Sequence, residues 1–587
     1  MLKKYFYFFG VLFFSFTLSF SQTLRVKIIE TSDVHGAVFP YDLINNRPSN
    51  SSLAQVSSYL KEQRLDTNQI VFLLDNGDIL QGDPAVYYYN FEKTDTLHLI
   101  ADVMNYMKYD AATAGNHDIE TGHEVYDKFN QEINFPWLAA NAVNTNTEQP
   151  YFKPYTTIER GGVKIAILGL ITPAIPKWLP EKIWSGIRFD DMIETAKKWV
   201  KKIRATEQPD LMVGLFHSGV DFTYGGENEN TDRNENASKL IAEQVDGFDL
   251  IFVGHDHAGW NFKTKGPAGR DVLILGTTAG AQNVAVASYV LKYDKMCMIY
   301  DKKEISGELV SIKDYSPDPD FIKRYEKNLT EVKNFVNRPI GKLTEPISSR
   351  DAIFGPSKFV DLIQSIQLEL TDADVSFTAP LSFNALIDKG TIYVKDMFDL
   401  YRFENLLYTM KLSGKEIKDC LEFSYGNWFN QMKDQEDYLL KFKLDEKGNI
   451  QYSERTKSPE LDERFYNYDA AAGIDYTVDV TKPVGERVNI IGFSNGNSFD
   501  INANYSVAIN SYRGNGGGGH LTRGAKIPQS DLSERIINST EKDLRYYLMK
   551  WIEKEKTVTP KLIGNWQVIP QEYWKAGKEK DYKILFK

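Results

Sequence analysis

The chain has 587 residues, of which 42% are hydrophobic and 25% are charged, as in an ordinary soluble globular protein. This length exceeds what one hydrophobic core usually supports, so two domains are expected. The formal net charge of −11 argues against binding to a nucleic acid polymer, because affinity for a phosphate backbone depends on clustered Lys and Arg side chains. A small phosphate ester held at a local metal site remains compatible with this charge.

The N-terminus has the layout of a secretory signal. Lys3 and Lys4 precede an aromatic and aliphatic stretch that ends in small residues. We therefore expect a signal peptide over residues 1–21 and a periplasmic or secreted protein. A retained anchor is the alternative, which the short apolar stretch disfavours. No Cys near the cleavage region could carry a lipid, so we expect no stable membrane anchor.

The remainder is read in chain order. Residues 22–313 alternate strands, such as 163–171 and 271–276, with loops and helices, which predicts an α/β domain. Apolar residues at helical spacing predict a linker helix within 314–338. A second domain over 339–540 mixes helices, such as 358–370, with strands, such as 474–480 and 505–512. Residues 541–587 are read as a surface helix and tail, and pairing of Cys297 with Cys420 is left open.

Five short strings repeat one context in the first domain. Each comes directly after an apolar run and therefore reads as the exit of a buried strand; the strings are TSDVHG (31–36), DNGD (75–78), GNHD (115–118), FHSG (216–219) and GHDH (254–257). In open α/β sheets, sites form at this carboxyl edge. Five of the eight histidines of the chain fall inside these strings, so they are better explained as parts of one site than as separate core histidines.

The strings predict a site for two metal ions. We assign Asp33, His35, Asp78 and His257 to one ion, and Asp78, Asn116, His217 and His255 to the other, so that Asp78 bridges the pair. Mixed Asp, Asn and His ligation suits two divalent ions such as Mn, Zn or Fe. Such a pair activates water and clamps the oxygens of a transferring phosphoryl group, which predicts hydrolysis of a phosphate ester.

His117 lies next to Asn116 but should point elsewhere, because neighbouring side chains diverge. It is a candidate catalytic residue that protonates the leaving group, with Glu120 three residues later to orient its ring. Support of Asn116 is the alternative reading of His117.

In the second domain, Tyr476 and Tyr512 are candidates to sandwich a nucleobase between two aromatic faces. Tyr476 could equally be a core aromatic of a strand. The glycine-rich loop after Tyr512 lets a ligand approach bare backbone, so the predicted substrate-binding set also includes Arg513, Gly514, Asn515, Gly516 and Gly517.

The strings SDVHG, DNGDILQG, GNHDIE, FHSG and GHDH, followed by YRGNGGGG, resemble those of the calcineurin-like metallophosphoesterases of the 5′-nucleotidase family, over roughly residues 24–540. Within the family, DNGDILQGDP and NSYRGNGGGGH are most similar to the periplasmic 2′,3′-cyclic-nucleotide 2′-phosphodiesterase/3′-nucleotidase group. The resemblance implies the same ligand positions, His117 as the catalytic histidine and both tyrosines as base-clamping aromatics. The chain departs from the pattern at Glu120, where Asp is common, and at Asp118, where Glu is common.

The resemblance also implies an N-terminal four-layer αββα metallophosphoesterase sandwich, a linker helix and an α+β C-terminal domain of the 5′-nucleotidase type. We expect a monomeric enzyme that hydrolyses small nucleotides, namely 2′,3′-cyclic nucleotides and 3′-nucleotides. A 5′-nucleotidase or UDP-sugar hydrolase is the alternative enzyme, and a non-catalytic nucleotide-binding protein is the alternative of another class.

Overall fold

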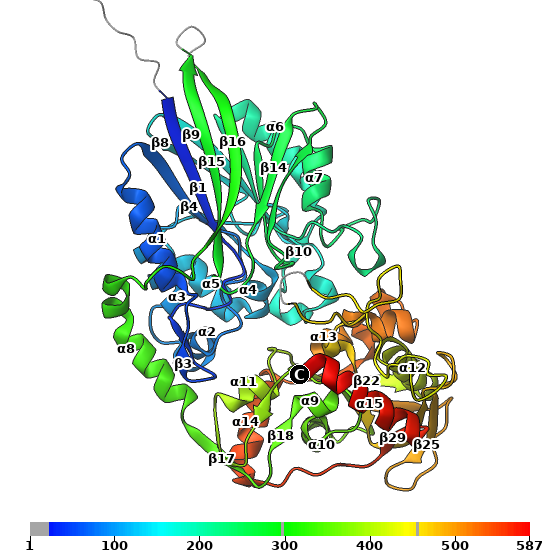
Figure 1. Ribbon diagram of the computed structural model, residues 1–587. Helices are drawn as coiled ribbons and strands as arrows, with labels where there is room; N and C mark the ends of the chain where they lie inside the picture. The colour runs from blue at the N-terminus through cyan, green and yellow to red at the C-terminus, as the bar shows by residue number, and fades with distance from the viewer. Residues whose placement is uncertain (1–22, 295–298, 454–456, 587) are drawn as a thin grey trace, which may run out of the picture.

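The computed structural model describes residues 23–294, 299–453 and 457–586, and its first half is built on two six-stranded sheets (Figure 1). The first sheet has the order β16-β15-β1-β4-β5-β6. Its strands are β1 (Thr23–Thr31), β4 (Gln69–Asp75), β5 (Ala111–Thr113), β6 (Trp137–Leu138), β15 (Asn283–Asp294) and β16 (Ile299–Ser311). Strands β1, β4, β5 and β6 run parallel, whereas β15 and β16 continue the sheet as an antiparallel hairpin.

The second sheet has the order β13-β14-β12-β11-β9-β8. Its strands are β8 (Tyr155–Arg160), β9 (Val163–Ile171), β11 (Leu211–His217), β12 (Leu250–Val253), β13 (Trp260–Lys265) and β14 (Asp271–Gly276). The four inner strands are parallel and the two edge strands antiparallel. Both faces of this sheet are covered, which is why β9 is apolar along nearly its whole length.

The two sheets pack face to face around one apolar core, which includes Ile28, Phe72, Ile165 and Val213. Helices cover the outer face of each sheet. Those on the first sheet are α1 (Leu53–Leu65), α3 (Leu99–Met107) and α5 (His123–Glu132); those on the second are α6 (Met192–Thr206) and α7 (Ser238–Gln244). The predicted four-layer αββα sandwich is therefore confirmed.

Helix α8 (Pro319–Val336) connects the two domains along one side of the molecule (Figure 1). It begins at Asp318, whose carboxylate accepts hydrogen bonds from the Ser57 hydroxyl and the Lys61 ammonium of α1, both at 2.7 Å. Its apolar face is buried, as the helical spacing predicts: Phe321 and Tyr325 are at most 1% exposed. The linker helix is thus present, while the domain boundaries drawn from sequence stay predictions.

The second domain is α+β. Its largest sheet has the order β23-β19-β26-β22-β27, with strands β19 (Val375–Thr378), β22 (Leu407–Ser413), β23 (Ala470–Ala472), β26 (Asn504–Asn510) and β27 (Ile536–Ser539). Helices α10 (Lys358–Thr371) and α12 (Gly414–Trp428) pack on it. Both begin at a serine cap: Ser357 Oγ accepts from Val360 N at 3.2 Å and Ser413 Oγ accepts from Glu416 N at 3.2 Å.

The interpretation of residues 541–587 as a surface helix and tail is wrong. This segment forms α14 (Leu544–Glu555), β28 (Thr557–Val558), β29 (Trp566–Ile569) and α15 (Gln571–Phe586). Strand β28 pairs with β17 (Pro339–Leu343), and β29 pairs in parallel with β24 (Ile474–Asp479), which also pairs with β25 (Val488–Phe493). The segment therefore completes two small sheets of the second domain.

The expectations about the signal peptide, the pairing of Cys297 with Cys420 and the membrane anchor depend in part on residues that the structure does not describe. The signal peptide predicted for residues 1–21 lies outside the described residues, and so does Cys297. Cys420 is a buried free thiol whose Sγ donates to the carbonyl oxygen of His520 at 3.4 Å. Among the residues that the structure describes, no helix has the length and apolar character needed to cross a membrane.

Candidate metal centre and substrate face

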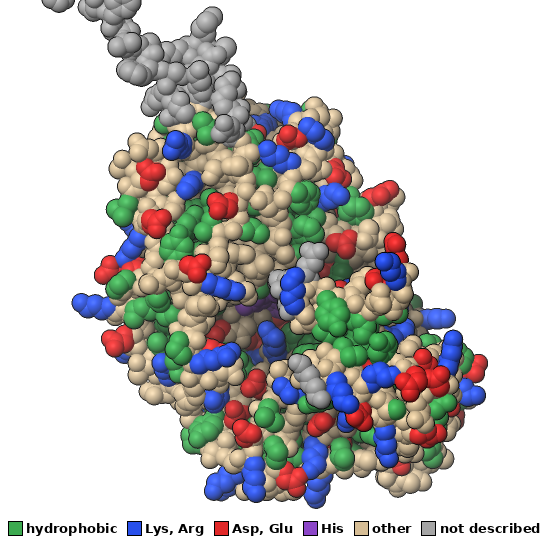
Figure 2. All heavy atoms as spheres, in the orientation of Figure 1, with side chains coloured by type: hydrophobic (Ala, Val, Ile, Leu, Met, Phe, Trp, Pro, Cys, Tyr) green, Lys and Arg blue, Asp and Glu red, His purple; other side chains and the backbone are tan. Residues whose placement is uncertain are grey.

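The predicted metal ligands all lie where strands of the two sheets end. Asp33 and His35 follow β1, Asp78 follows β4, Asn116 begins α4 (Asn116–Glu120) after β5, His217 ends β11, and His255 and His257 follow β12. The amide of Asp33 donates to the carbonyl oxygen of Gly77 at 2.9 Å, and Asn76 Nδ2 donates to the carbonyl oxygen of Phe216 at 3.0 Å. The second bond ties the two sheets together at this edge. In the space-filling view, histidine atoms are visible in a hollow between the two domains (Figure 2).

The first group consists of Asp33, His35 and His257, whose ligand atoms lie within 4.8 Å of one another. The Nε2 atoms of His35 and His257 are 3.1 Å apart, and His257 Nε2 is 3.2 Å from Asp33 Oδ1. Asp33 is completely buried, whereas the His257 side chain is 39% exposed. The group is therefore buried on the Asp33 side and open to solvent at its histidines, because His35 is also partly exposed.

The second group consists of Asp78, His217 and His255, again with ligand atoms within 4.8 Å of one another. Asn116 completes it: its Oδ1 is 3.1 Å from His217 Nε2 and 2.9 Å from His255 Nδ1. Asp78 Oδ2 is 3.1 Å from His217 Nε2. Asp78 belongs to this group and not to the first, so its bridging role stays a prediction.

The geometry of the histidines fits cations in both groups. His35 Nδ1 is 3.0 Å from the Gln81 carbonyl oxygen, and His217 Nδ1 is 2.7 Å from the Asn76 carbonyl oxygen. Because a carbonyl oxygen accepts only, each Nδ1 carries a proton, and each Nε2 faces into its group, where it can act as a metal ligand once deprotonated. Burial, partly offset by Asp78, lowers the pKa of His35 to about 4, which keeps this ring neutral. Histidine nitrogens and carboxylate oxygens that converge in this way suit a bound cation.

The backbone at the site is held in an unusual conformation. Five of the predicted ligands have positive φ angles: 51° at Asp33, 50° at His35, 56° at Asp78, 74° at His255 and 57° at His257. Non-glycine residues adopt this region rarely and at a cost. The surrounding fold therefore fixes the loops so that the side chains converge.

Asp118 is the main support for the Asp78 loop, and sequence reasoning did not assign it a role. Its Oδ1 accepts from the amides of Ile79 and Leu80, both at 2.9 Å, and its Oδ2 accepts from those of Asp78 at 3.0 Å and Gly115 at 2.8 Å. A carboxylate that takes four amide donors joins the β4 and β5 loops rigidly. It departs from the family pattern by one methylene and still makes these contacts.

His117 and Glu120 form the predicted pair. His117 Nδ1 is 2.5 Å from Glu120 Oε2, so the longer glutamate arm reaches the ring. The His117 ring centroid is 5.5 Å from that of His35, which places it beside the first group and not within either. Burial lowers the pKa of His117, but the carboxylates of Asp78 and Glu120 outweigh it and raise the pKa to about 9. A protonated His117 can donate a proton at neutral pH.

The prediction that Tyr476 clamps a base is wrong. Tyr476 is 1% exposed, and its ring stacks on Trp566 of β29 with a centroid distance of 5.7 Å and an interplanar angle of 1°. Its hydroxyl is 2.8 Å from that of Tyr425 and accepts from Ala471 N at 3.0 Å. Both faces and the hydroxyl are used within the core, so the alternative reading as a strand aromatic is correct.

Arg513 is also structural, contrary to its predicted place in the substrate-binding set. It is 1% exposed, its Nε is 2.6 Å from Asp469 Oδ2, and its Nη2 donates to the Tyr466 carbonyl oxygen at 3.1 Å. The glycines likewise make room for side chains: a Cβ at Gly517 would lie 2.6 Å from the Tyr512 ring, and one at Gly514 would lie 2.5 Å from the Tyr408 ring. Gly516 has a φ of 102°.

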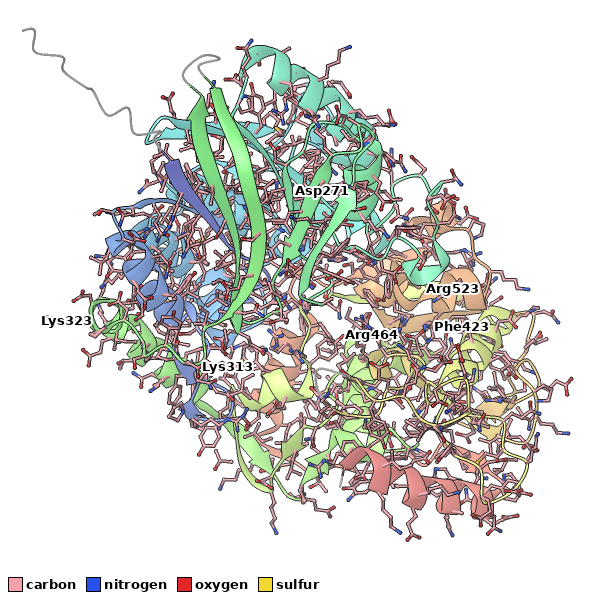
Figure 3. The ribbon with its side chains drawn as sticks, turned by 45° about the horizontal axis from the view of Figure 1, so that its top comes forward. Asp271, Lys313, Lys323, Phe423, Arg464 and Arg523 are labelled. Carbon is pink, nitrogen blue, oxygen red and sulfur yellow. The ribbon has the colours of Figure 1, made fainter. Side chains whose placement is uncertain are left out.

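Tyr512, on α13 (Ser511–Gly514), is partly exposed and lies near Tyr224 of the first domain and near Tyr466, which sequence reasoning did not single out. Burial raises the pKa of Tyr512, Arg513 lowers it, and the nearby Tyr466 and Tyr224 hydroxyls raise it. Tyr466 is partly exposed, and Arg464 Nη1 donates to its hydroxyl at 2.8 Å. Arg464 lies where the two domains meet (Figure 3), 5.8 Å from the ring of Tyr224 of the first domain.

The second domain approaches the second metal group through one residue of the first domain, Trp178. Asn515 Nδ2 donates to the carbonyl oxygen of Trp178 at 3.2 Å. The Trp178 ring stacks on His255 with a centroid distance of 5.5 Å. The glycine-rich loop and the second metal group are therefore separated by a single side chain.

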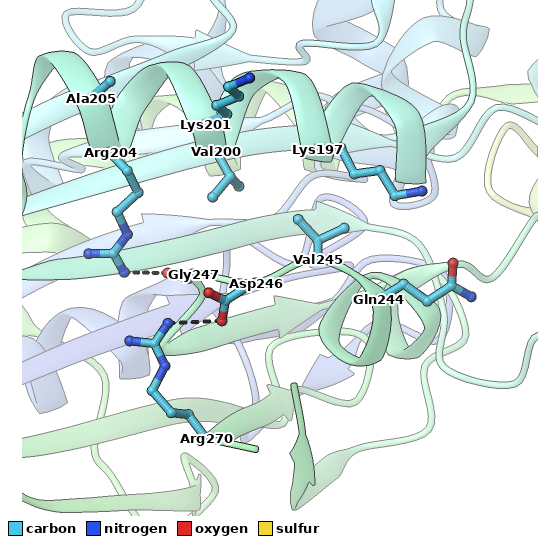
Figure 4. Close-up of a pocket in the computed structure, with 10 residues that line it drawn as sticks. All are labelled: Lys197, Val200, Lys201, Arg204, Ala205, Gln244, Val245, Asp246, Gly247 and Arg270. Carbon is cyan, nitrogen blue, oxygen red and sulfur yellow. Dashed lines mark hydrogen bonds and ion pairs between the residues drawn. The ribbon is translucent and has the colours of Figure 1, made fainter. Parts of the chain in front are cut away.

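A surface cavity of about 720 Å³ beside α6 shares no residue with this site (Figure 4). Its arginines are used by the fold: Arg270 Nη2 is 2.8 Å from Asp246 Oδ1, and Arg204 donates to the Gly247 carbonyl oxygen. We therefore place the functional site at the converging histidines and not at this cavity.

Comparisons with known proteins agree with this geometry. The family description calcineurin-like phosphoesterase matches residues 26–259, and 5′-nucleotidase, C-terminal domain matches residues 339–523. A trifunctional nucleotide phosphoesterase protein of Bacillus subtilis is 28% identical over 94% of this chain and 39% of its own length. A 2′,3′-cyclic-nucleotide 2′-phosphodiesterase/3′-nucleotidase of Haemophilus influenzae is 24% identical over 93% of this chain and 87% of its own. This chain thus spans about two fifths of the Bacillus protein.

Two solved structures share the fold over 93% of this chain. One is a candidate 5′-nucleotidase of Staphylococcus aureus, with a TM-score of 0.74, 21% identity and 99% of its own chain covered. The other is a 5′-nucleotidase precursor of Thermus thermophilus, with a TM-score of 0.61, 20% identity and 100% of its own chain covered. The chain therefore has the two-domain 5′-nucleotidase fold, in which a calcineurin-like phosphoesterase domain is followed by a 5′-nucleotidase C-terminal domain.

Proposed function

We propose that this protein is an exported, metal-dependent phosphoesterase that hydrolyses 2′,3′-cyclic nucleotides and 3′-nucleotides. The observation that carries the hydrolytic activity is the convergence of two groups of metal-ligating side chains beside the His117–Glu120 pair. A calcineurin-like phosphoesterase domain implies divalent metals. We propose two ions, Mn, Zn or Fe, with Asp33, His35 and His257 at one, Asn116, His217 and His255 at the other, and Asp78 between them.

Divalent ions in these groups supply positive charge for the phosphoryl oxygens and lower the pKa of bound water. Side chains of the protein position and protonate the leaving group. Glu120 orients the His117 ring through Nδ1, which leaves Nε2 free to give a proton to the leaving alkoxide. The hydrogen bond from His117 N to Asp78 Oδ1, at 2.8 Å, fixes the helix that carries this ring relative to the metal groups.

The nucleotide would be recognised by the second domain. Tyr512 and Tyr466 lie at the face where Arg464 and Tyr224 bring the two domains together. A base stacked on these rings leaves its ribose and phosphate turned towards the metal groups of the other domain. Stacking contributes about 1–3 kcal/mol per base and does not read the edge of the base, so we expect a tolerant enzyme.

The relatives support the cyclic and 3′ substrates. Proteins named 2′,3′-cyclic-nucleotide 2′-phosphodiesterase/3′-nucleotidase align over 93–94% of this chain, whereas those named 5′-nucleotidase align over 68%. The shared fold with solved 5′-nucleotidases keeps a 5′-nucleotidase as the second candidate. A non-catalytic nucleotide-binding protein is disfavoured, because both metal groups and the His117–Glu120 pair are complete.

Parallel assays of 2′,3′-cyclic AMP, 3′-AMP and 5′-AMP with the Mn²⁺-loaded protein test this proposal. We expect kcat/KM for the first two to exceed that for 5′-AMP by at least tenfold. Preference for 5′-AMP would select the second candidate. No hydrolysis of any of them, nor of bis(p-nitrophenyl) phosphate, would reject catalysis altogether. N-terminal sequencing of the exported protein tests the signal peptide, with Gln22 expected as the first residue.

A further inference from the structure

The two nitrogens of the His255 ring have different partners. Nδ1 lies 2.9 Å from Asn116 Oδ1, within the second metal group, whereas Nε2 lies 3.0 Å from Glu235 Oε1 on the opposite side. Both side chains are largely buried, with 13% of His255 and 16% of Glu235 exposed. The contact is therefore shielded from water and defines the orientation of the ring.

Glu235 is itself held rigidly, although it lies in the loop before α7. Its carbonyl oxygen accepts from the hydroxyls of Thr172 at 3.1 Å and Ser218 at 2.8 Å, and its amide donates to Glu227 Oε2 at 2.9 Å. Thr172 follows β9 and Ser218 follows β11, so the backbone of Glu235 is fixed to the ends of two strands of the second sheet. The backbone from which the Glu235 carboxylate extends is therefore held in place.

We propose that Glu235 is a positioning residue that sets the tautomer and the orientation of His255 for metal binding. A carboxylate only accepts, so Nε2 carries the proton and the lone pair of Nδ1 points into the group with Asp78 and His217. Trp178 stacks on the ring, 5.5 Å between centroids, and limits its tilt. In His35 and His217, carbonyl oxygens accept the hydrogen bond of the other ring nitrogen. In His255 the acceptor is a carboxylate, which also makes Nδ1 more basic and therefore a stronger metal ligand.

This inference rests on the proposed function in one respect, namely that the second group binds a metal ion. Glu235 could instead serve only to hold its loop. The two roles differ in what they change: loss of a positioning carboxylate weakens metal affinity through His255, whereas loss of a loop contact lowers the stability of the metal-free protein.

The test uses the full-length protein and Mn²⁺ alone as probe. Binding to wild type, Glu235→Ala, Glu235→Gln and the exposed control Glu229→Ala is measured by equilibrium dialysis, and the melting temperature of each metal-free protein is recorded. We expect one of the two Mn²⁺ sites, the one that contains His255, to lose 10- to 100-fold in affinity in Glu235→Ala. Glu235→Gln retains an acceptor for Nε2–H and should recover much of this loss, while Glu229→Ala should match wild type.

A second pair of variants keeps the inference falsifiable if Glu235→Ala is poorly folded. Glu235→Leu keeps most of the side-chain volume but removes the acceptor; it should weaken Mn²⁺ binding in the wild-type background and change Mn²⁺ affinity no further in a His255→Ala background, because the ring through which Glu235 acts is gone. Equal losses in both backgrounds, or wild-type affinity in Glu235→Ala, would overturn the inference. Failure of wild type itself to bind Mn²⁺, Zn²⁺ or Fe²⁺ would instead reject the proposed function.

Discussion

The Nε2 atoms of His35 and His257 face each other at 3.1 Å, although the two residues are 222 positions apart in the chain. His35 Nδ1 is engaged by the Gln81 carbonyl oxygen, so the lone pair of its Nε2 is directed at His257. His257 Nε2 also lies 3.2 Å from Asp33 Oδ1, so two imidazole nitrogens and a carboxylate oxygen converge on one point. The strand-end loops therefore hold the histidines in an arrangement that a bound cation stabilises.

Removal of metal should accordingly destabilise the protein. A ligand that binds only the folded state stabilises it by about 2.7 kcal/mol at a free concentration 100 times its Kd. We expect the melting temperature of the first domain to fall after treatment with a chelator and to recover on addition of Mn²⁺. Calorimetry of the stripped and reloaded protein measures this. Identical melting curves would show that the groups bind no metal under these conditions.

Asp78 should be required for both ions if it bridges them. Replacing Asp78 by Asn preserves the volume of a side chain that is 1% exposed but removes its charge. We expect fewer than two Mn per chain and loss of turnover, because the second group loses its only carboxylate. Elemental analysis after dialysis decides the point, with Glu229→Ala as control. Two Mn per chain in Asp78→Asn would contradict the bridging assignment.

His117 should act on the leaving group and not on metal binding. Since its ring belongs to neither metal group, we expect His117→Ala to retain both ions while kcat falls by about 10²-fold or more. Glu120→Gln should show a smaller loss, because the amide oxygen can still accept from Nδ1–H. Metal content that falls together with activity would identify His117 as a ligand.

The strand-end residues could be predicted from the sequence because their signal is local: an apolar run followed by Asp, Asn or His is visible in each string. The second aromatic of the proposed base clamp, beside Tyr512, could not be predicted. Tyr476 and Tyr466 are both tyrosines near one strand, and the choice depends on Trp566, which covers Tyr476 from a strand 90 residues downstream in the chain. The glycine run is easily seen in the sequence. Its structural role, which is to let the Tyr512 ring pack against Gly517, becomes visible only in the folded protein. Glu235 stands in a loop without periodicity, so no pattern indicates its contact with His255.

If Tyr466 and Tyr512 stack on the base, their replacement should affect hydrolysis of a nucleotide but not of an ester without a base. Replacing Tyr466 and Tyr512 by Ala should raise KM for 2′,3′-cyclic AMP by about tenfold or more, because stacking of about 1–3 kcal/mol per base is lost. Hydrolysis of bis(p-nitrophenyl) phosphate, which has no base, should change little. Tyr476→Phe is the matched control, since it removes only a hydroxyl that is buried in the core. Equal losses on both substrates would show that Tyr466 and Tyr512 are structural.

His98 predicts how stability depends on pH. This residue is 2% exposed and caps α3: Nδ1 accepts from Ile100 N at 3.2 Å, and Nε2 donates to Asn90 Oδ1 at 2.9 Å. Burial, with a further contribution from Lys128, lowers its pKa from 6.5 to about 3. The folded protein therefore keeps His98 neutral where the unfolded chain takes up a proton. The stabilising contribution is present above pH 6.5 and is lost as the pH falls towards 3.

Replacing His98 by Asn should remove this dependence, because Asn can still cap the helix but does not titrate. Between pH 7 and pH 5, the free energy of unfolding of the first domain should fall by about 2 kcal/mol more in wild type than in His98→Asn. Urea denaturation at the two pH values measures the difference, and the titrations of all other groups cancel in the comparison. The variant itself is expected to be less stable at pH 7, since Asn leaves part of the space of the imidazole ring unfilled. An equal fall in both proteins would show that His98 is protonated in the folded state, and its role as an uncharged cap would have to be abandoned.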